Sequence, residues 1–253
     1  MMIKFNDRQV MESVKDFAEE EAEKGNKHVI NLENRFALRH YQRIAEEISC
    51  CLVPGAKILD WGCGYGHMSF FLSSLGFKAV PSDVQMISHG FIDKMGIKDF
   101  VHIDPVYLPF RAESFDAILS CGTLEHVVDQ DKSLEELNRA LKRNGRLFIY
   151  MLPHKFGFYE MIATLLKASD HPIKYSFSSI EKLLGRHGFK VAKFARSNLF
   201  PKNIVFVPDF MRKLIKRFYD KNYDFLVHFE DFLLKIPLVN MFFGTIELVA
   251  KKI

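Results

Sequence analysis

The stretch Ile58-Leu59-Asp60-Trp61-Gly62-Cys63-Gly64-Tyr65-Gly66 decides the fold of this chain. It is an apolar run that ends in an acidic residue and continues into three glycines at alternate positions. Glycine lets a bulky ligand approach the backbone closely, and the start of a following helix offers unpaired N–H groups and a partial positive charge. The stretch therefore predicts a buried strand, a ligand-binding turn and a helix.

Short apolar runs and amphipathic stretches alternate on both sides of this turn. Strands are expected at 57–60, 77–83, 99–104, 114–122, 146–153, 188–196 and 244–252, and helices at 8–24, 35–50, 67–75, 84–95, 133–142, 157–168, 178–187, 209–219 and 222–234. Such alternation is typical of a parallel sheet covered on both faces. We predict an α/β fold: a doubly wound, mostly parallel seven-stranded sheet with helices on both faces, N-terminal helices, a helical insertion before the last strand and an antiparallel last strand.

Length and composition favour a single domain. The chain has 253 residues, of which 48% are hydrophobic and 26% charged, as in ordinary globular proteins. We expect one domain over 1–253, with an N-terminal helical segment (1–52), a ligand-binding core (53–196), an aromatic and basic helical lid (197–242) and a last strand (243–253). The formal net charge of +4 is too small to indicate nucleic-acid binding.

The cysteines and the N-terminus indicate the cellular compartment in which the protein is expected. The four cysteines form no CxxC pair, and the N-terminus has no apolar signal-peptide region. No run approaches the roughly 18 apolar residues of a membrane span. These features predict a cytoplasmic protein.

Two acidic residues refine the kind of ligand. The glycine spacing is GxGxG, which differs from the dinucleotide pattern GxGxxG, and no Walker-type GK[ST] is present. Asp83 ends the second expected strand, where a carboxylate can accept both ribose hydroxyls, and Asp104 ends the third, near an adenine amino group. Parallel sheets bind ligands at the carboxyl ends of their strands, so a nucleotide-type ligand is expected there.

In this order, the motifs resemble those of the Rossmann-like S-adenosylmethionine-dependent methyltransferases, in particular the broad group that includes the quinone-biosynthesis methyltransferases. The resemblance extends from about Glu33 to Phe194. It rests on the segments 36–40, 58–66, 104–110, 114–127 and 137–149 together with Asp83. The chain departs from the family pattern at Pro105, where alanine is usual, and at Arg143-Asn144, where proline and glycine are usual.

The resemblance implies S-adenosylmethionine as cofactor and assigns its contacts to strand ends and one upstream arginine. Those residues are Arg39, Asp60, Gly62, Cys63, Gly64, Asp83, Asp104 and Cys121. Asp60 is expected to bond the amino group of the methionine moiety, Asp83 the ribose and Asp104 the adenine. Arg39 is expected to pair with the carboxylate, while the glycine turn and the backbone at Cys121 pack against the methionine moiety.

Two histidines are candidates for catalysis. His126 and His154 both follow strands at the ligand edge of the sheet, and a histidine pKa lies near neutrality. Either can serve as a general base, which methyl transfer needs only when the acceptor is a hydroxyl or a carbon acid. Either can instead be a capping or orienting residue.

A metal is not expected. Some relatives bind Mg²⁺ through an E-x-x-E-H motif, and the matching segment here is Gly122-Thr-Leu-Glu125-His126. Its first carboxylate is missing, and a hard divalent cation needs several oxygen ligands.

The region before the last strand is rich in aromatic and basic residues. Seven basic and two acidic residues lie between Arg196 and Lys221, interleaved with phenylalanines. Three interpretations remain open: a helical layer packed on the sheet, an apolar pocket for a lipid, quinone or lipid-linked sugar, or docking on an anionic membrane.

Together these features predict methyl transfer to a small-molecule or lipid-linked acceptor, with no nucleic acid and with peripheral membrane contact through 200–221. The sequence does not indicate the oligomeric state. A catalytically silent methyltransferase-like binding partner and an RNA methyltransferase are the alternatives.

Overall fold

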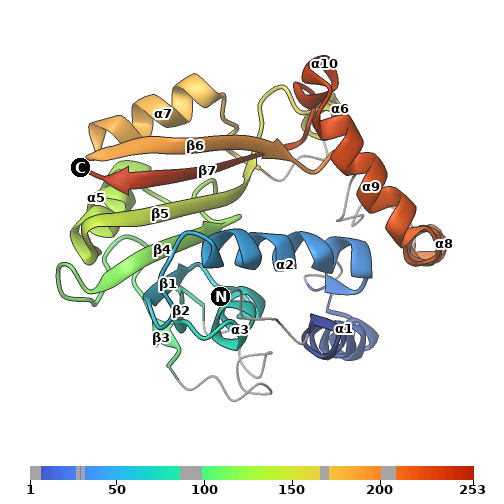
Figure 1. Cartoon of the computed structure of the whole chain (residues 1–253), viewed down its shortest axis with the longest axis horizontal. Coiled ribbons are helices and arrows are strands. Elements are labelled where there is room, and N and C mark those ends of the chain that lie inside the picture. The colour runs from blue at the N-terminus through green and yellow to red at the C-terminus, as the bar shows by residue number, and fades with distance from the viewer. Residues whose placement is uncertain (1–6, 27–28, 30–31, 86–98, 166–170, 201–208) are drawn as a thin grey trace.

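The computed structural model describes residues 7–26, 29, 32–85, 99–165, 171–200 and 209–253. Most of the helix expected at 84–95 lies outside the described residues, as does the part of the aromatic and basic region at 201–208. The strands are β1 (Lys57–Trp61), β2 (Lys78–Asp83), β3 (Val101–His102), β4 (Phe115–Cys121), β5 (Leu141–Pro153), β6 (Phe189–Ser197) and β7 (Thr245–Lys252) (Figure 1). The helices are α1 (Asp7–Glu23), α2 (Arg35–Ser49), α3 (His67–Ser74), α5 (Gln130–Ala140), α6 (Phe158–Leu165), α7 (Phe177–Arg186), α8 (Asp209–Lys221), α9 (Tyr223–Leu234) and α10 (Pro237–Asn240).

The strands form one seven-stranded sheet in the order β3-β2-β1-β4-β5-β7-β6. The first five strands pair in parallel, and β7 is antiparallel to both β5 and β6. This confirms the predicted fold class. The third strand is much shorter than expected from 99–104, since Pro105 disfavours further regular pairing and Asp104 opens a turn.

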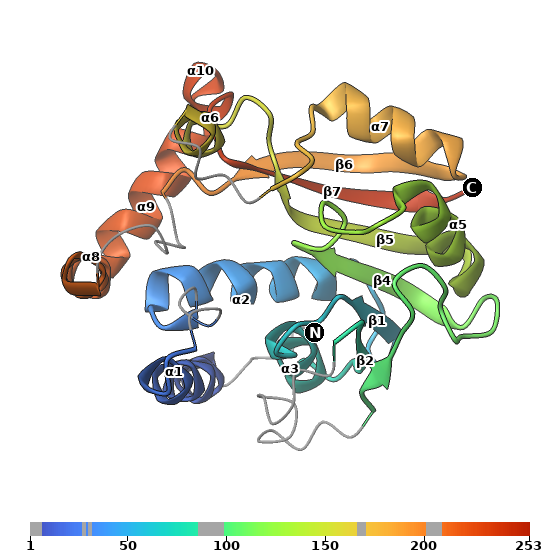
Figure 2. The same cartoon turned by 180° about the vertical axis from the view of Figure 1, so that it is seen from behind.

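Both faces of the sheet are buried, which explains the continuous apolar character of its strands. Along β1, Ile58 enters one core with α1, α2 and α3, while Leu59 enters the other core with α5 and α7. Figures 1 and 2 show these two helical layers on opposite faces. The alternation fixes the register of the strand, because a slip by one residue would exchange the two faces.

Side-chain caps fix where several helices begin. Asn34 accepts a hydrogen bond from the Ala37 N–H at the start of α2, and Asp129 accepts one from the Lys132 N–H at the start of α5. A reciprocal pair of bonds between Ser176 and Ser179 opens α7. Such caps satisfy N–H groups that the first helical turn leaves unpaired.

The helices before β7 lie along one side of the molecule. In Figures 1 and 2, α6 and α10 share one corner, and α9 extends from there to α8. A small core of Phe36, Tyr219 and Leu226 joins α2 to α8 and α9. The apolar stripe of α8 is not packed on the sheet, so that interpretation is wrong: the exposed fractions of Phe210, Leu214 and Phe218 are 72%, 66% and 52%.

Among the helices that the structure describes, none combines the length and the hydropathy needed to cross a bilayer.

Candidate functional site

Two adjoining cavities lie at the carboxyl ends of the parallel strands, beside the point between β1 and β4 where the chain reverses its winding direction. The first has a volume of about 310 Å³ and the second of about 280 Å³. Gly62, Gly122 and His126 line both cavities. A ligand that extends from one cavity into the other therefore passes the ends of β1 and β4.

The first cavity is mainly apolar. Trp61, Ile103 and Pro105 line it from the β1 and β3 side, and the segment 127–128 lines it from the loop after β4. Asp83 contributes a carboxylate. An apolar cavity with one acid in its wall suits an adenosine group.

The glycine turn is fixed by close packing. Gly62 has φ +72°, and a Cβ there would lie 2.9 Å from the Cβ of Thr123 and closer still to the rest of that side chain. The Thr123 hydroxyl donates to the carbonyl oxygens of Trp61 and Gly62, which ties the end of β1 to the loop after β4. Gly64 has φ +52° and faces open space in the second cavity. A side chain at Gly62 would thus disrupt the turn, whereas Gly64 leaves room for a ligand.

Asp83 stabilises the same turn. Its two carboxylate oxygens accept hydrogen bonds from the N–H groups of Gly64 (2.9 Å) and Gln85 (3.1 Å). The carboxylate lies at the end of β2 and borders the first cavity. This position is compatible with the expected ribose contact.

Asp60 lies beneath the turn and borders the second cavity. It is 1% exposed and accepts a hydrogen bond of 2.7 Å from the Ser69 hydroxyl. Burial raises the pKa of Asp60 to about 6, although the hydrogen bonds from Ser69 oppose the shift. A buried carboxylate of this kind suits a cationic partner such as an amino group.

Asp104 does not line either cavity, although its chain neighbours Ile103 and Pro105 line the first. It is exposed, and its Oδ1 accepts hydrogen bonds from the N–H groups of Val106 and Tyr107. These two bonds lower the pKa of Asp104. Among the described contacts its role is to hold a turn, and the expected adenine contact stays a prediction.

Cys63 and Cys121 both line the second cavity. Burial, with the nearby charge of Asp60, raises the pKa of each thiol above its ordinary value. Both are therefore neutral near pH 7, and a neutral thiol is a poor nucleophile. Small side chains next to a ligand are the role that fits them.

His67, the first residue of α3, is a cavity residue that the sequence analysis missed. Both of its ring nitrogens are buried and have no hydrogen-bond partner among the described residues. Burial lowers the pKa of His67 to about 4. Buried polar atoms without a hydrogen-bond partner in a cavity wall indicate that a bound ligand supplies the missing hydrogen bonds.

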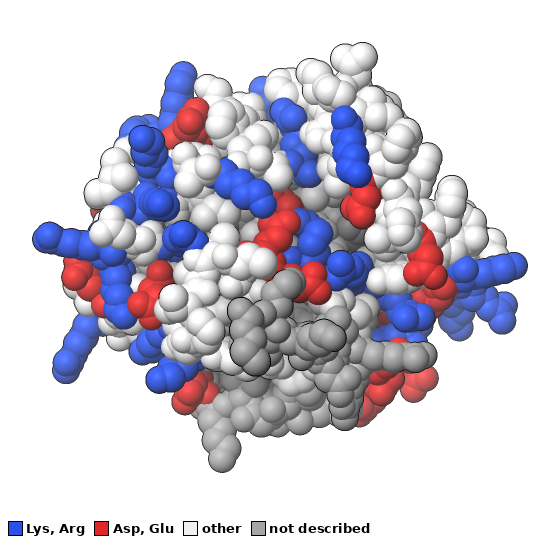
Figure 3. All heavy atoms as spheres, in the orientation of Figure 1, with Lys and Arg blue, Asp and Glu red and all other residues white. Residues whose placement is uncertain are grey.

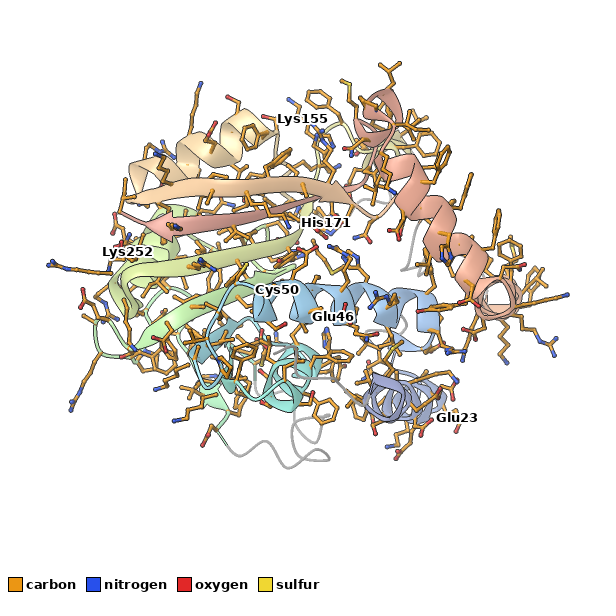
Figure 4. All side chains as sticks on the ribbon, viewed as in Figure 1. Glu23, Glu46, Cys50, Lys155, His171 and Lys252 are labelled. Atoms are coloured by element: carbon orange, nitrogen blue, oxygen red, sulfur yellow. The ribbon has the colours of Figure 1, made fainter. Side chains whose placement is uncertain are left out.

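His126 and His171 face the second cavity from different segments of the chain. His126 follows β4, while His171 precedes α7, and their ring centroids are 5.6 Å apart. Glu160 accepts a hydrogen bond of 2.6 Å from Nδ1 of His171. Figure 4 shows His171 between the strands and α2. His171 belongs to no sequence motif, so it could not be identified from the sequence.

Two expected site residues lie elsewhere. Arg39 is not in the wall of either cavity: it pairs with Glu46 at 3.1 Å and borders a separate hollow between α2 and α9. His154 is buried, and its Nδ1 lies 3.1 Å from the carbonyl oxygen of Phe243. Burial lowers the pKa of His154. Arg39 is on the α9 side of its helix, and His154 links the end of β5 to the segment before β7. Their expected roles in donor binding and catalysis stay predictions.

The Met151 side chain of β5 lines the second cavity because the backbone of β5 is irregular at this residue. Its φ is +59°, and the pairing of β5 with β7 shifts register between Ile149 and Leu152. Bulges of this kind re-aim side chains next to ligand sites.

Comparisons with known proteins agree with this geometry. The family model described as "Methyltransferase domain" matches residues 59–149. A demethylmenaquinone methyltransferase of Clavibacter sepedonicus is 36% identical over 115 residues, which cover 42% of this chain and 45% of that protein. A ubiquinone/menaquinone biosynthesis C-methyltransferase of Hahella chejuensis is 32% identical over 108 residues, covering 38% and 42%. The matches thus span less than half the length of these two relatives.

A solved structure shares the fold over most of its length. The putative sarcosine dimethylglycine methyltransferase of Galdieria sulphuraria aligns with a TM-score of 0.59 and 18% identity, over 85% of this chain and 86% of that one. The family match over residues 59–149, the quinone-biosynthesis relatives and the shared fold together support a class I S-adenosylmethionine-dependent methyltransferase. Its methyltransferase domain and its fold indicate S-adenosylmethionine as the cofactor.

Proposed function

We propose that this protein transfers a methyl group from S-adenosylmethionine to a small-molecule or lipid-linked acceptor. Two cavities that meet at Gly62, Gly122 and His126 support the proposal. The first suits the adenosine of the donor, and the second combines polar and apolar walls beyond it. The names of the quinone-biosynthesis relatives favour an acceptor with an apolar ring or tail.

The residues of the turn hold the donor. Asp83 accepts from the ribose hydroxyls, Asp60 faces the amino group, and the open space at Gly64 admits the methionine moiety. When bound, S-adenosylmethionine supplies a methyl group on a positively charged sulfur, so the leaving group needs no further activation. The protein mainly aligns the acceptor with that methyl group.

A proton must leave when the acceptor is a hydroxyl or a carbon acid. His126 borders both cavities and is the sequence-predicted base that lies in the site. An imidazole with a pKa near neutrality can accept that proton. Replacement of His126 by asparagine is then expected to lower kcat and to leave donor affinity nearly unchanged.

Calorimetry and a transfer assay test the proposal. Titration with S-adenosylmethionine should give micromolar binding that Asp83→Ala weakens at least tenfold. Donor labelled in its methyl group, incubated with the apolar and the water-soluble fractions of a cell extract, should label the apolar fraction. Absence of heat with both the donor and its demethylated product would overturn the proposal. Donor binding without labelling of any fraction would favour the silent binding partner.

The face shown in Figure 3 does not favour the RNA alternative. Figure 3 shows basic side chains interspersed with acidic ones on the face displayed, without a continuous basic stripe. RNA-binding surfaces gather their basic residues on one face. Tight, salt-dependent RNA binding by the protein would contradict this part of the proposal.

We also propose that α8 docks on an anionic membrane surface. Phe210, Leu214 and Phe218 form an exposed stripe at helical spacing. Lys213, Arg217 and Lys221 form an exposed stripe beside it, and Figure 3 shows basic side chains at the end of the molecule where α8 lies. An apolar stripe flanked by lysine and arginine is the pattern of helices that bind anionic lipid surfaces. The neighbouring helices continue this edge with exposed Phe225, Phe232, Leu238 and Met241.

Liposome flotation tests the docking. The protein should float with vesicles that contain phosphatidylserine and remain below with purely zwitterionic vesicles. The triple variant Lys213→Gln, Arg217→Gln, Lys221→Gln should lose most of this binding, whereas Lys182→Gln with Lys190→Gln, at exposed positions on α7 and β6, should not. Equal binding by both variants and the wild type, or no binding by any, would refute docking through α8.

A further inference from the structure

Three metal-ligating side chains converge in the wall of the second cavity. One ligand atom each from Glu125, His126 and His171 lies within 4.8 Å of the other two. Glu125 and His126 follow β4, whereas His171 lies 45 residues further along the chain and reaches them only through the fold. We propose that Glu125, His126 and His171 bind a divalent transition-metal ion at the acceptor side of the donor site.

The donor set favours a borderline metal. Two imidazoles and one carboxylate are ligands typical of Zn²⁺ and Fe²⁺, whereas Mg²⁺ prefers oxygen ligands throughout. Three protein ligands leave a coordination position for water or substrate, as in catalytic zinc sites. Because all three residues line the cavity, a group bound in the cavity can take that position.

A second layer of residues orients His171. Glu160, which is buried, accepts a hydrogen bond of 2.6 Å from Nδ1 of His171 and lies 3.3 Å from Nζ of Lys174. The Glu160 carboxylate is thus held between His171 and Lys174. A carboxylate on one ring nitrogen directs the other nitrogen of a histidine toward a metal.

The electrostatics of the cluster also favour a cation. Glu125 is 2% exposed, and its Oε1 lies 3.9 Å from Nε2 of His126. The rings of His126 and His171 lie 5.6 Å apart beside this carboxylate. A metal ion can bind both rings and compensate the charge of Glu125.

The inference rests on the proposed function and narrows its acceptor. A metal ion lowers the pKa of a hydroxyl that it binds. The acceptor class is then a molecule with a metal-binding hydroxyl, such as a phenol or an enol. His126 acts as a metal ligand in this case, and the acceptor proton is released to water without a protein base.

Metal titration tests the site without any need for methyl transfer. Protein without a histidine tag is stripped with a chelator and titrated with Zn²⁺ by calorimetry, in the absence of donor and acceptor. We expect one equivalent to bind, with affinity reduced about 100-fold or more by Glu125→Gln or His171→Asn. Glu160→Gln, which removes only the orienting carboxylate, should reduce it about 10–100-fold. His228→Asn, at an exposed histidine on α9, is the matched control and should bind as the wild type does.

Cobalt spectra separate this site from the cysteines. Co²⁺ bound by Glu125, His126 and His171 should give visible d–d bands without a thiolate charge-transfer band. Absence of Zn²⁺ binding, binding unchanged in the three site variants, or a thiolate band lost on replacement of Cys50 and Cys51 would each overturn the inference. Retained donor binding shows that a variant is folded.

The two proposals fail in different ways. A protein that binds S-adenosylmethionine and transfers methyl groups after chelation, but binds no Zn²⁺, refutes the metal site alone. A protein that binds Zn²⁺ through Glu125 and His171 but never binds the donor refutes the proposed function alone.

Discussion

Asp60 is a buried carboxylate at the donor site, and its pKa departs from that of an ordinary aspartate. Its folded-state pKa of about 6, against 3.8 for an ordinary aspartate, means that the folded protein holds this proton more tightly than the unfolded chain. Its contribution to stability is therefore complete below about pH 4 and is lost as the pH rises to 6. The loss corresponds to about 3 kcal/mol.

We expect Asp60→Asn to stabilise the unliganded protein. The asparagine oxygen can still accept from Ser69, while the cost of a buried charge disappears. The gain in the free energy of unfolding should approach 3 kcal/mol at pH 7.5 and vanish towards pH 4. Urea denaturation across this range measures it, and a variant less stable than the wild type at pH 7.5 would contradict the expectation.

The same group predicts how donor binding depends on pH. If Asp60 pairs with the donor's amino group, protonation removes that partner, so affinity should fall about fivefold between pH 6 and pH 5. Calorimetry at several pH values measures the profile. The Asp60→Asn variant should bind more weakly at pH 7.5 and with a flatter profile; an unchanged slope in the variant would assign the effect to another group.

A comparison of alanine substitutions at Gly62 and Gly55 separates the effect of a steric clash from the effect of backbone strain. Both have φ between +70° and +80°, but only at Gly62 would a Cβ collide, with Thr123. We expect Gly55→Ala to cost about 1 kcal/mol, the usual penalty for this conformation, and Gly62→Ala to cost clearly more and to abolish donor binding. Thermal unfolding and donor titration measure both, and equal losses would show that packing at Thr123 contributes little.

At the scale of elements, a buried charge network joins α2 to β7. Glu247, which is 3% exposed, lies 2.6 Å from Nη2 of Arg43, and the Ser197 hydroxyl donates to it at 2.5 Å. Removing one partner from a buried pair leaves the other charge uncompensated. Glu247→Ala should therefore destabilise the protein by about 3–5 kcal/mol. Glu181→Ala, at an exposed position on α7, should change stability by less than about 0.5 kcal/mol; a similar loss in both would argue against the network.

The sequence predicted which segments form helices and strands more reliably than it predicted what those helices and strands pack against. The apolar periods of β1 and α8 located both elements to within two residues. The same period could not reveal what the apolar stripe of α8 faces, because burial against a sheet and exposure at an edge leave an identical pattern. The early start of β5 at Leu141 was also missed, since the left-handed Asn144 within it resembles a turn.

At the scale of the whole molecule, donor binding should raise thermal stability. A ligand that binds only the folded state at about 100 times its Kd adds about 2.7 kcal/mol. For a chain of this length that corresponds to a rise in Tm of about 5–10 °C. A thermal-shift assay with S-adenosylmethionine and its demethylated product measures the rise, and ATP is the control that should give none.

Site residues that lie in one local motif could be predicted from the sequence, whereas residues that come from distant parts of the chain could not. Asp60, Gly62, Gly64 and Asp83 lie in local motifs, and the structure brings them together at the strand ends. His171 and Glu160 could not be found, because only the tertiary fold brings them to the cavity. The expected contact of Arg39 rests on a short motif match, which carries no information about which side of its helix faces the cavity.

The bulge at Met151 has a consequence for how acceptor preference can diverge. A side chain in a bulge is released from the cross-strand pairing that constrains its neighbours. Its left-handed backbone is also one that glycine or asparagine adopts more easily than methionine. Single substitutions at this position can thus reshape the cavity without disturbing the sheet, which gives descendants of this protein a short mutational route to new acceptors.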